Sequence, residues 1–115
     1  MTNIEIVPAT ADLLIRFFGQ LPQKSVRAIV AMKDDEPIAV SGLYMDRTRH
    51  VLFSEWKPEM LNNKKAIVRA MRETRRLIQS ATLPVHAVAS EDSNDGIILR
   101  HLGFHEQEGV FVWHS

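Results

Sequence analysis

Two titratable side chains in "HVLFSEW", at residues 50–56, are of the types that transfer protons. Imidazole and carboxylate groups can both accept a proton from a nucleophile, so either His50 or Glu55 could act as a general base. The β-branched and aromatic residues predict a strand, in which His50 and Ser54 share one face while Phe53 and Glu55 lie on the other. Each also has a simpler interpretation: His50 as a solvated turn residue after "DRTR", and Glu55 as a half-exposed strand carboxylate.

The other histidines give weaker indications. His86, in "PVHAVAS", could face the same cleft or be an ordinary core or edge residue. His101, His105 and His114 are interpreted as surface residues. The sequence predicts no metal site, and the absence of cysteine excludes thiolate ligands, disulfides and cysteine nucleophiles.

The composition predicts one globular domain over residues 1–115. The chain is 45% hydrophobic and 24% charged, and its 14 basic and 14 acidic residues give a formal net charge of zero. No overall field therefore attracts nucleic acid or an anionic membrane. No apolar run approaches the roughly 20 residues that span a bilayer, and "MTNIEIVPAT" lacks a signal-peptide pattern. We expect a soluble, cytoplasmic protein.

Hydrophobic periodicity predicts the order strand–helix, three strands, helix, strand, helix, strand. Alternating apolar residues that stop at Pro8 indicate the first strand, and Thr10 can cap a helix that Gly19 and Pro22 close. We expect an α+β fold, with a mixed, mostly antiparallel sheet flanked by helices. The predicted elements are strand 4–8, helix 11–18, strands within 26–45 around an acidic turn at 34–37, strand 50–56, helix 64–81, strand 84–90, helix 93–103 and strand 109–115.

The longest predicted helix carries a cluster of basic residues beside its apolar stripe. These arginines could contact nucleic-acid phosphates, but zero net charge and the lack of interleaved aromatic residues favour a solvated helix face. The basic residues are Lys64, Lys65, Arg69, Arg72, Arg75 and Arg76.

The element order and four stretches of sequence together resemble the GNAT superfamily of acetyl-coenzyme A dependent N-acetyltransferases. "IEIVPATADL" is similar to the superfamily's first strand and helix, "PIAVSGLYM" to its third strand, and "SEWKPEM" to the end of its fourth. "SEDSNDGIILRHLGF" resembles the closing motif, in which a helix ends in Leu-Gly-Phe before the last strand. The compact chain also resembles the small, divergent GNAT-like proteins of tailed bacteriophages and prophages.

This resemblance implies transfer of an acetyl group from acetyl-CoA to an amine. In the superfamily a backbone N–H near the fourth strand stabilises the oxyanion, the pantetheine arm pairs with the open edge beside the fifth strand, and the pyrophosphate rests at the start of the following helix. The matching segments here are 53–56, 84–89 and 61–66. Some members use a glutamate of the fourth strand as base; its position matches His50 most nearly, with Glu55 as a second candidate. The expected cofactor-binding residues are Phe53, Ser54, Trp56, Leu61, Asn62, Asn63, Lys64, Lys65, Ala66 and Asp92.

The cofactor loop departs from the superfamily pattern, which has arginine or glutamine followed by glycines. This chain has "LNNKKAI" instead. Asn62 or Asn63 could take the backbone conformation of glycine, while the positive charges of Lys64 and Lys65 attract the phosphates in place of a close backbone fit. Alternatively, one asparagine is an ordinary N-cap and the lysines belong to a solvated face. We expect weak, charge-dependent binding of acetyl-CoA.

The final helix departs as well. Many members have a tyrosine there that protonates the departing thiolate, and this chain has Leu99. Tyr44 cannot replace it, because it lies in the third predicted strand. The usual capping asparagine is Asp92, which preserves capping.

Two classes of function follow from these departures. In the first, the protein is an N-acetyltransferase acting on a small-molecule or protein amine. In the second, catalysis is lost and the protein is a binding or virion-assembly component of a phage or prophage. The single N-terminal helix and the apolar last strand "VFVWH" are compatible with a homodimer that completes the acceptor site.

Overall fold

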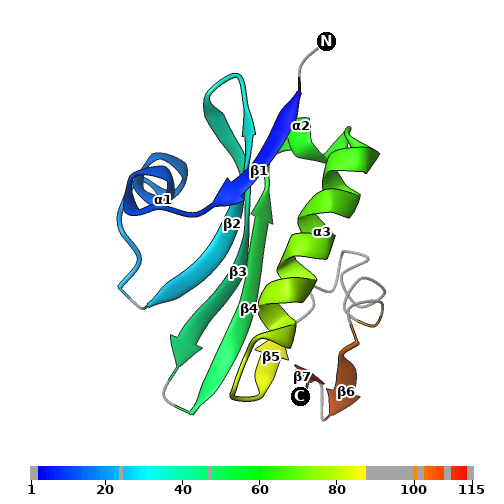
Figure 1. Ribbon diagram of the computed structural model, residues 1–115. Coiled ribbons are helices and arrows are strands. Elements are labelled where there is room, and N and C mark those ends of the chain that lie inside the picture. The colour runs from blue at the N-terminus through cyan, green and yellow to red at the C-terminus, as the bar shows by residue number, and fades with distance from the viewer. Residues whose placement is uncertain are drawn as a thin grey trace.

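The computed structural model describes residues 3–23, 25–46, 48–87, 100, 103–107 and 110–113, in which seven strands form one sheet (Figure 1). The elements in chain order are β1 (Ile4–Pro8), α1 (Ala11–Phe18), β2 (Val26–Lys33), β3 (Glu36–Asp46), β4 (Arg49–Trp56), α2 (Pro58–Leu61), α3 (Lys64–Gln79), β5 (Val85–Ala87), β6 (His105–Gln107) and β7 (Val110–Trp113). The strand order is β1-β2-β3-β4-β5-β7-β6. Only β4 and β5 are parallel neighbours; the other pairs are antiparallel. The predicted mixed, mostly antiparallel sheet is confirmed.

Helices α1 and α3 cover opposite faces of the sheet (Figure 1). On one face Leu14 of α1 packs against Val30 and Val40. On the other face Ala70 of α3 packs in a cluster with Ala31. Adjacent strand residues therefore serve different cores, as the period-two pleat requires. The near-continuous apolar run of β2 reflects this burial on both sides.

The first helix forms as its sequence predicts. The hydroxyl of Thr10 accepts a hydrogen bond from the N–H of Leu13 at 3.2 Å, and Gly19 ends the helix at φ 82°. A residue with a Cβ seldom adopts that left-handed conformation, whereas glycine does so readily. Local capping chemistry thus fixes both ends of α1.

A buried hydroxyl pair fixes α3 on β3. Thr74 of α3 donates through Oγ1 to the carbonyl oxygen of Ala70 at 2.8 Å, and its Oγ1 accepts from the hydroxyl of Ser41 at 3.0 Å. Both side chains are almost fully buried. Hydrogen bonding offsets the cost of burying the two hydroxyl groups, so the pair gives the helix a specific position on the sheet.

Three details differ from the sequence predictions. The β2–β3 turn contains only Asp34 and Asp35, both with positive φ, whereas Glu36 and Pro37 already belong to β3. Two short elements, α2 and β6, were not predicted. Both are too short to show a helical or strand period, and α2 begins at a proline, which suits the first turn of a helix. Helix α3 begins at Lys64, as predicted, but ends at Gln79, so buried Ala81 follows the helix.

The predicted helix 93–103 lies mostly outside the described residues. Its end is described: Arg100 is helical, and Gly103 has φ 100° with its N–H bonded to the carbonyl of Arg100 at 3.0 Å. Phe104 is buried directly after it. Leu-Gly-Phe therefore acts as a C-cap glycine followed by a core residue. Nowhere in the described part of the chain is a helix long and apolar enough to cross a bilayer.

Candidate functional site

Within the described part of the chain, β4 and β5 pair at His50 with Val85 and at Val51 with His86. The predicted adjacency of segments 50–56 and 84–89 is confirmed at these pairs. The N–H of His50 donates to the carbonyl of Pro84 at 2.9 Å.

The hydrogen bond of His50 shows which amides of β4 face this edge. Strand backbone groups alternate in direction, so the N–H groups of Ser54 and Trp56 point the same way as that of His50. The N–H of Lys57 points the other way, to Ile38 of β3. Among the described residues no strand lies beside Ser54 and Trp56. The described residues therefore leave the N–H groups of Ser54 and Trp56 without a strand partner at this edge.

The start of α3 lies directly after this edge in the chain and carries uncompensated positive charge. Lys64 and Lys65 are exposed, and the first turn contains no acidic residue. The first N–H groups of a helix have no partner within it. Here the Ala66 N–H bonds to Oδ1 of Asn63 at 3.0 Å, while the amides of the two lysines have no partner among the described residues. Two free amides and two ammonium groups therefore favour an anion.

Neither asparagine of the loop between α2 and α3 takes the left-handed conformation that favours glycine. Asn62 follows α2 at φ −85°, and Asn63 is the N-cap of α3 at φ −118°. Neither is left-handed, so the idea that asparagine replaces glycine in that conformation is wrong. The interpretation of one asparagine as an N-cap is confirmed for Asn63.

Removing this cap gives a direct test of the helix start. We expect Asn63→Ala to lower the free energy of unfolding by about 1 kcal/mol, because it leaves the Ala66 N–H without its partner. Urea denaturation measures the loss. Asn62→Ala is the matched control, since that exposed side chain makes no hydrogen bond to other described residues. Equal losses in the two variants would contradict the assignment of Asn63 as the cap.

The remaining predicted cofactor residues lie in different environments. Ser54 is exposed, whereas Trp56 is half-buried and packs against the core under α3. Phe53 packs on the opposite face, in the core under α1. Leu61 is 59% exposed, while the side chain of Ala66 is fully buried. Asp92 and Leu99 lie outside the described residues.

The two candidate bases occupy opposite faces of β4. His50 is half-buried and lies where β4 is paired with β5. It is four residues before Ser54, a separation of about 13 Å at strand rise. Glu55 is exposed, lies on the α1 face with Phe53, and is flanked by the two residues whose amides are unpaired. The structure therefore brings Glu55, and not His50, to the open end of the edge.

His86 lies at the closed end. Its neighbours Val85 and Ala87 pack into the core with Ile78 of α3, so His86 lies on the α1 face. Its Nδ1 is 3.4 Å from a guanidinium nitrogen of Arg49.

A group of aromatic rings on the α1 face was missed by sequence reasoning. Phe53 lies 5.9 Å from Tyr44 and 6.4 Å from Phe18, measured between ring centroids, and Phe18 lies 5.0 Å from Phe17. The ammonium group of Lys57 stands 5.3 Å from the Phe17 centroid. We call Phe17, Phe18, Tyr44 and Phe53 the aromatic cluster. The cluster lies on the same face of the sheet as Glu55. One indication of this was available in the sequence, because Phe53 and Glu55 are two residues apart in a predicted strand and therefore share a face.

Comparison with known proteins identifies the fold. No protein-family model matches the sequence, and a search of curated proteins gives no match. Three solved structures from Escherichia coli are similar over nearly their whole length. ElaA has 14% sequence identity and a TM-score of 0.62, and the match covers 97% of each chain. The ribosomal-protein-S18-alanine N-acetyltransferase has 13% identity and a TM-score of 0.60, and the match covers 97% of this chain and 91% of that one. The putative N-acetyltransferase YhhK, bound to coenzyme A, has 12% identity and a TM-score of 0.55, and the match covers 100% of this chain and 99% of that one.

At these identities the likeness concerns the fold alone. The phage and prophage resemblance receives no support from these structures. With β4 parallel to β5 and the long helix α3 between them in the chain, the chain has the GNAT N-acetyltransferase fold.

Proposed function

We propose that this protein is a coenzyme A dependent N-acyltransferase that moves an acetyl group from acetyl-CoA to an amine. The observation that carries the proposal is that two sets of hydrogen-bond donors, one at the end of β4 and one at the start of α3, follow each other along the chain. The amides of Ser54 and Trp56, which no described strand pairs, lead through α2 to the amides and ammonium groups of Lys64 and Lys65, which have no partner among the described residues. An extended ligand ending in a pyrophosphate is complementary to such a row.

Each part of the row has a distinct role. Bound acetyl-CoA supplies an activated thioester. The amides at the end of β4 hold the extended arm and donate to the carbonyl oxygen as negative charge develops on it. The start of α3 holds the pyrophosphate through charge and two amides. Because Asn63 occupies the Ala66 N–H, fewer amides remain than in an uncapped helix start.

Glu55 is the proposed base. As the amine nitrogen forms its bond to the acetyl carbon and the carbon–sulfur bond breaks, the carboxylate takes the proton that the nitrogen loses. The thiolate leaves and is protonated by water. The aromatic cluster beside Glu55 provides an apolar wall for the acceptor, which we propose to be a small-molecule or protein amine.

Coenzyme A binding tests this proposal directly. We expect calorimetry to show weak binding that weakens further as salt rises, because exposed lysines are strongly hydrated and screened within about 8 Å at physiological ionic strength. Lys64→Ala with Lys65→Ala should remove most of the salt dependence, at about 1 kcal/mol or less for each lysine.

Arg75→Ala with Arg76→Ala is the matched control. It removes the same charge from the other end of the same helix and should leave binding almost unchanged. Tight, salt-independent binding would show that backbone fit dominates over charge. No binding at low salt would refute the proposal and favour a non-catalytic binding protein.

A further inference from the structure

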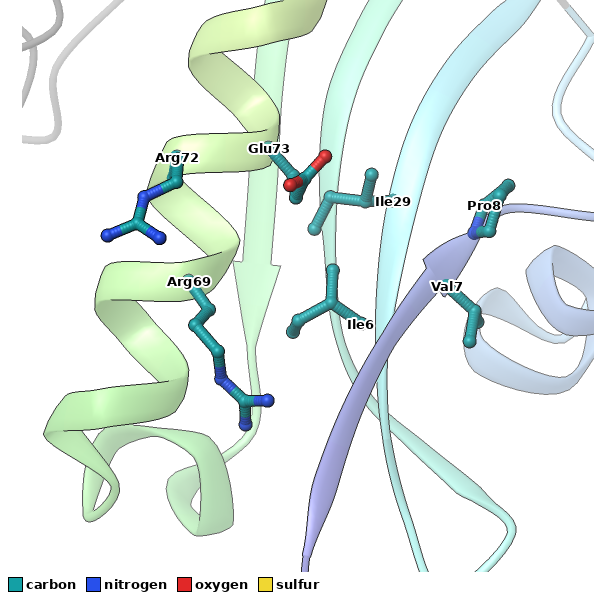
Figure 2. A pocket seen from close by; sticks show the side chains of 7 residues that line it. All are labelled: Ile6, Val7, Pro8, Ile29, Arg69, Arg72 and Glu73. Carbon is teal, nitrogen blue, oxygen red and sulfur yellow. The ribbon is translucent and has the colours of Figure 1, made fainter.

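A second pocket lies between α3 and the first two strands, away from the edge of β4 (Figure 2). Its volume is about 320 Å³. Ile6 of β1 and Ile29 of β2 form an apolar floor, and Arg69, Arg72 and Glu73 of α3 form the opposite wall. None of the residues assigned to the coenzyme site lines it. A pocket with an apolar floor and a charged wall is complementary to a small ligand that has an apolar body and a charged end.

Arg69 is held in position at this pocket. Its Nη2 donates to the carbonyl oxygen of Ile4 at 2.6 Å, and Figure 2 shows the side chain directed toward β1. This bond uses one of the five N–H groups of the guanidinium. The remaining donors are therefore preorganised at the pocket, which lowers the entropic cost of binding an anion.

A backbone donor lies beside this guanidinium. The N–H of Ala9 donates to Ala28 of β2, so alternation directs the N–H of Ile6 away from β2, to the same edge as the Ile4 carbonyl. Strand β1 is the edge of the sheet, and no described strand covers it. Pro8 has no N–H, so Ile6 supplies the amide that faces outward over the pocket.

The charged side chains of α3 that line the pocket give it a net positive charge. Glu73 accepts a hydrogen bond from Arg76 at 2.9 Å through Oε1, so its charge is already compensated. Arg72 has no partner among the residues that the structure describes. In Figure 2 its guanidinium is turned away from Ile6 and Ile29, which places a second cation at the rim.

We propose that this pocket binds a small aliphatic carboxylate. The carboxylate accepts from Arg69 and from the N–H of Ile6, Arg72 adds attraction at the rim, and the hydrocarbon body lies on Ile6 and Ile29. A cavity of about 150 Å³ accepts benzene, so this volume suits a ligand of roughly ten heavy atoms. A free acid of that size fits, and the site is independent of the coenzyme.

The probe is 4-methylpentanoate, titrated into protein carrying labelled isoleucine methyl groups. We expect the methyl signals of Ile6 and Ile29 to shift with a dissociation constant of about 1 mM, typical for a ligand of this size. The uncharged amide of the same shape should bind at least about tenfold more weakly, because it loses the charge-assisted hydrogen bonds. Saturating coenzyme A should leave the titration unchanged.

Variants on one helix provide the controls. Arg69→Gln should weaken binding more than about tenfold and Arg72→Gln about threefold to fivefold. Arg75→Gln, on the same helix outside the pocket, should have no effect. Since Arg69 also anchors β1, Arg72→Gln tests the site in a protein whose β1 contact is intact. Equal binding of acid and amide, equal weakening by Arg75→Gln, displacement by coenzyme A, or unshifted Ile6 and Ile29 signals would each overturn the proposal.

Discussion

Replacing Gly42 by alanine is expected to destabilise the fold strongly. Gly42 of β3 lies directly opposite Ala28 of β2. A Cβ at this position would meet the carbonyl oxygen of Arg27 and both carbon atoms, Cα and Cβ, of Ala28 closer than 3.0 Å. Backbone atoms in the middle of a sheet cannot move aside without breaking the β2–β3 ladder. We expect a loss of about 3 kcal/mol or more, and a melting temperature lower by more than about 12 °C.

Gly19→Ala separates this steric effect from a general glycine effect. A Cβ at Gly19 would meet nothing within 4 Å, although the residue has φ 82°. Its cost should be about 1 kcal/mol, from backbone strain alone. Thermal denaturation followed by circular dichroism compares the two variants. If both melt at the same temperature, the close approach of β2 and β3 at Gly42 is not as described.

The second large effect concerns catalysis. If the protein acetylates an amine, Glu55→Gln should lower kcat/KM by on the order of 10²-fold, because the isostere keeps the shape and loses the base. His50→Gln should cost less than about tenfold, since His50 lies on the other face of β4 at its paired end. Tyr44→Phe should leave the rate unchanged. Rates against pH, measured with coenzyme A release, distinguish the three variants.

Binding measurements keep this test interpretable. Coenzyme A affinity should be the same in the Glu55 variant and the unmodified protein, because the carboxylate acts on the amine. A large rate loss in His50→Gln with full activity in Glu55→Gln would reverse the assignment. Unchanged rates in both would leave positioning and desolvation as the sources of catalysis.

The elements that were predicted correctly from the sequence include those whose ends are fixed by capping residues. Thr10 and Gly19 fix α1, and the Leu-Gly-Phe stretch ends in the expected glycine cap at Gly103. The short elements α2 and β6 gave no such signal. They form because neighbouring segments supply their partners: Met60 of α2 is fully buried against the sheet, and β6 pairs with β7.

The candidate site was only partly predictable for a related reason. Asparagine suits both an N-cap and a left-handed turn, so the residue type alone did not decide the conformation of Asn63. The end of α2 at Leu61 decides it, since the chain must turn there into α3. The aromatic cluster depends on register: Tyr44 lies opposite Val51, which sets it diagonally beside Phe53 on the same face. Register follows from the whole sheet rather than from local pattern.

The parallel pairing of β4 with β5 also determines when the site can form during folding. The strands from β1 to β4 are neighbours in the chain, and the two-residue turn between β2 and β3 closes a local hairpin. The pair of His50 with Val85 instead closes a long loop that contains all of α3. Loop closure has an entropic cost, so contacts distant in sequence form later than local ones. The edge of β4 that is proposed to bind coenzyme A therefore lies at the boundary between an early N-terminal meander and a late C-terminal half. A coenzyme bound there should slow amide hydrogen exchange most at β5.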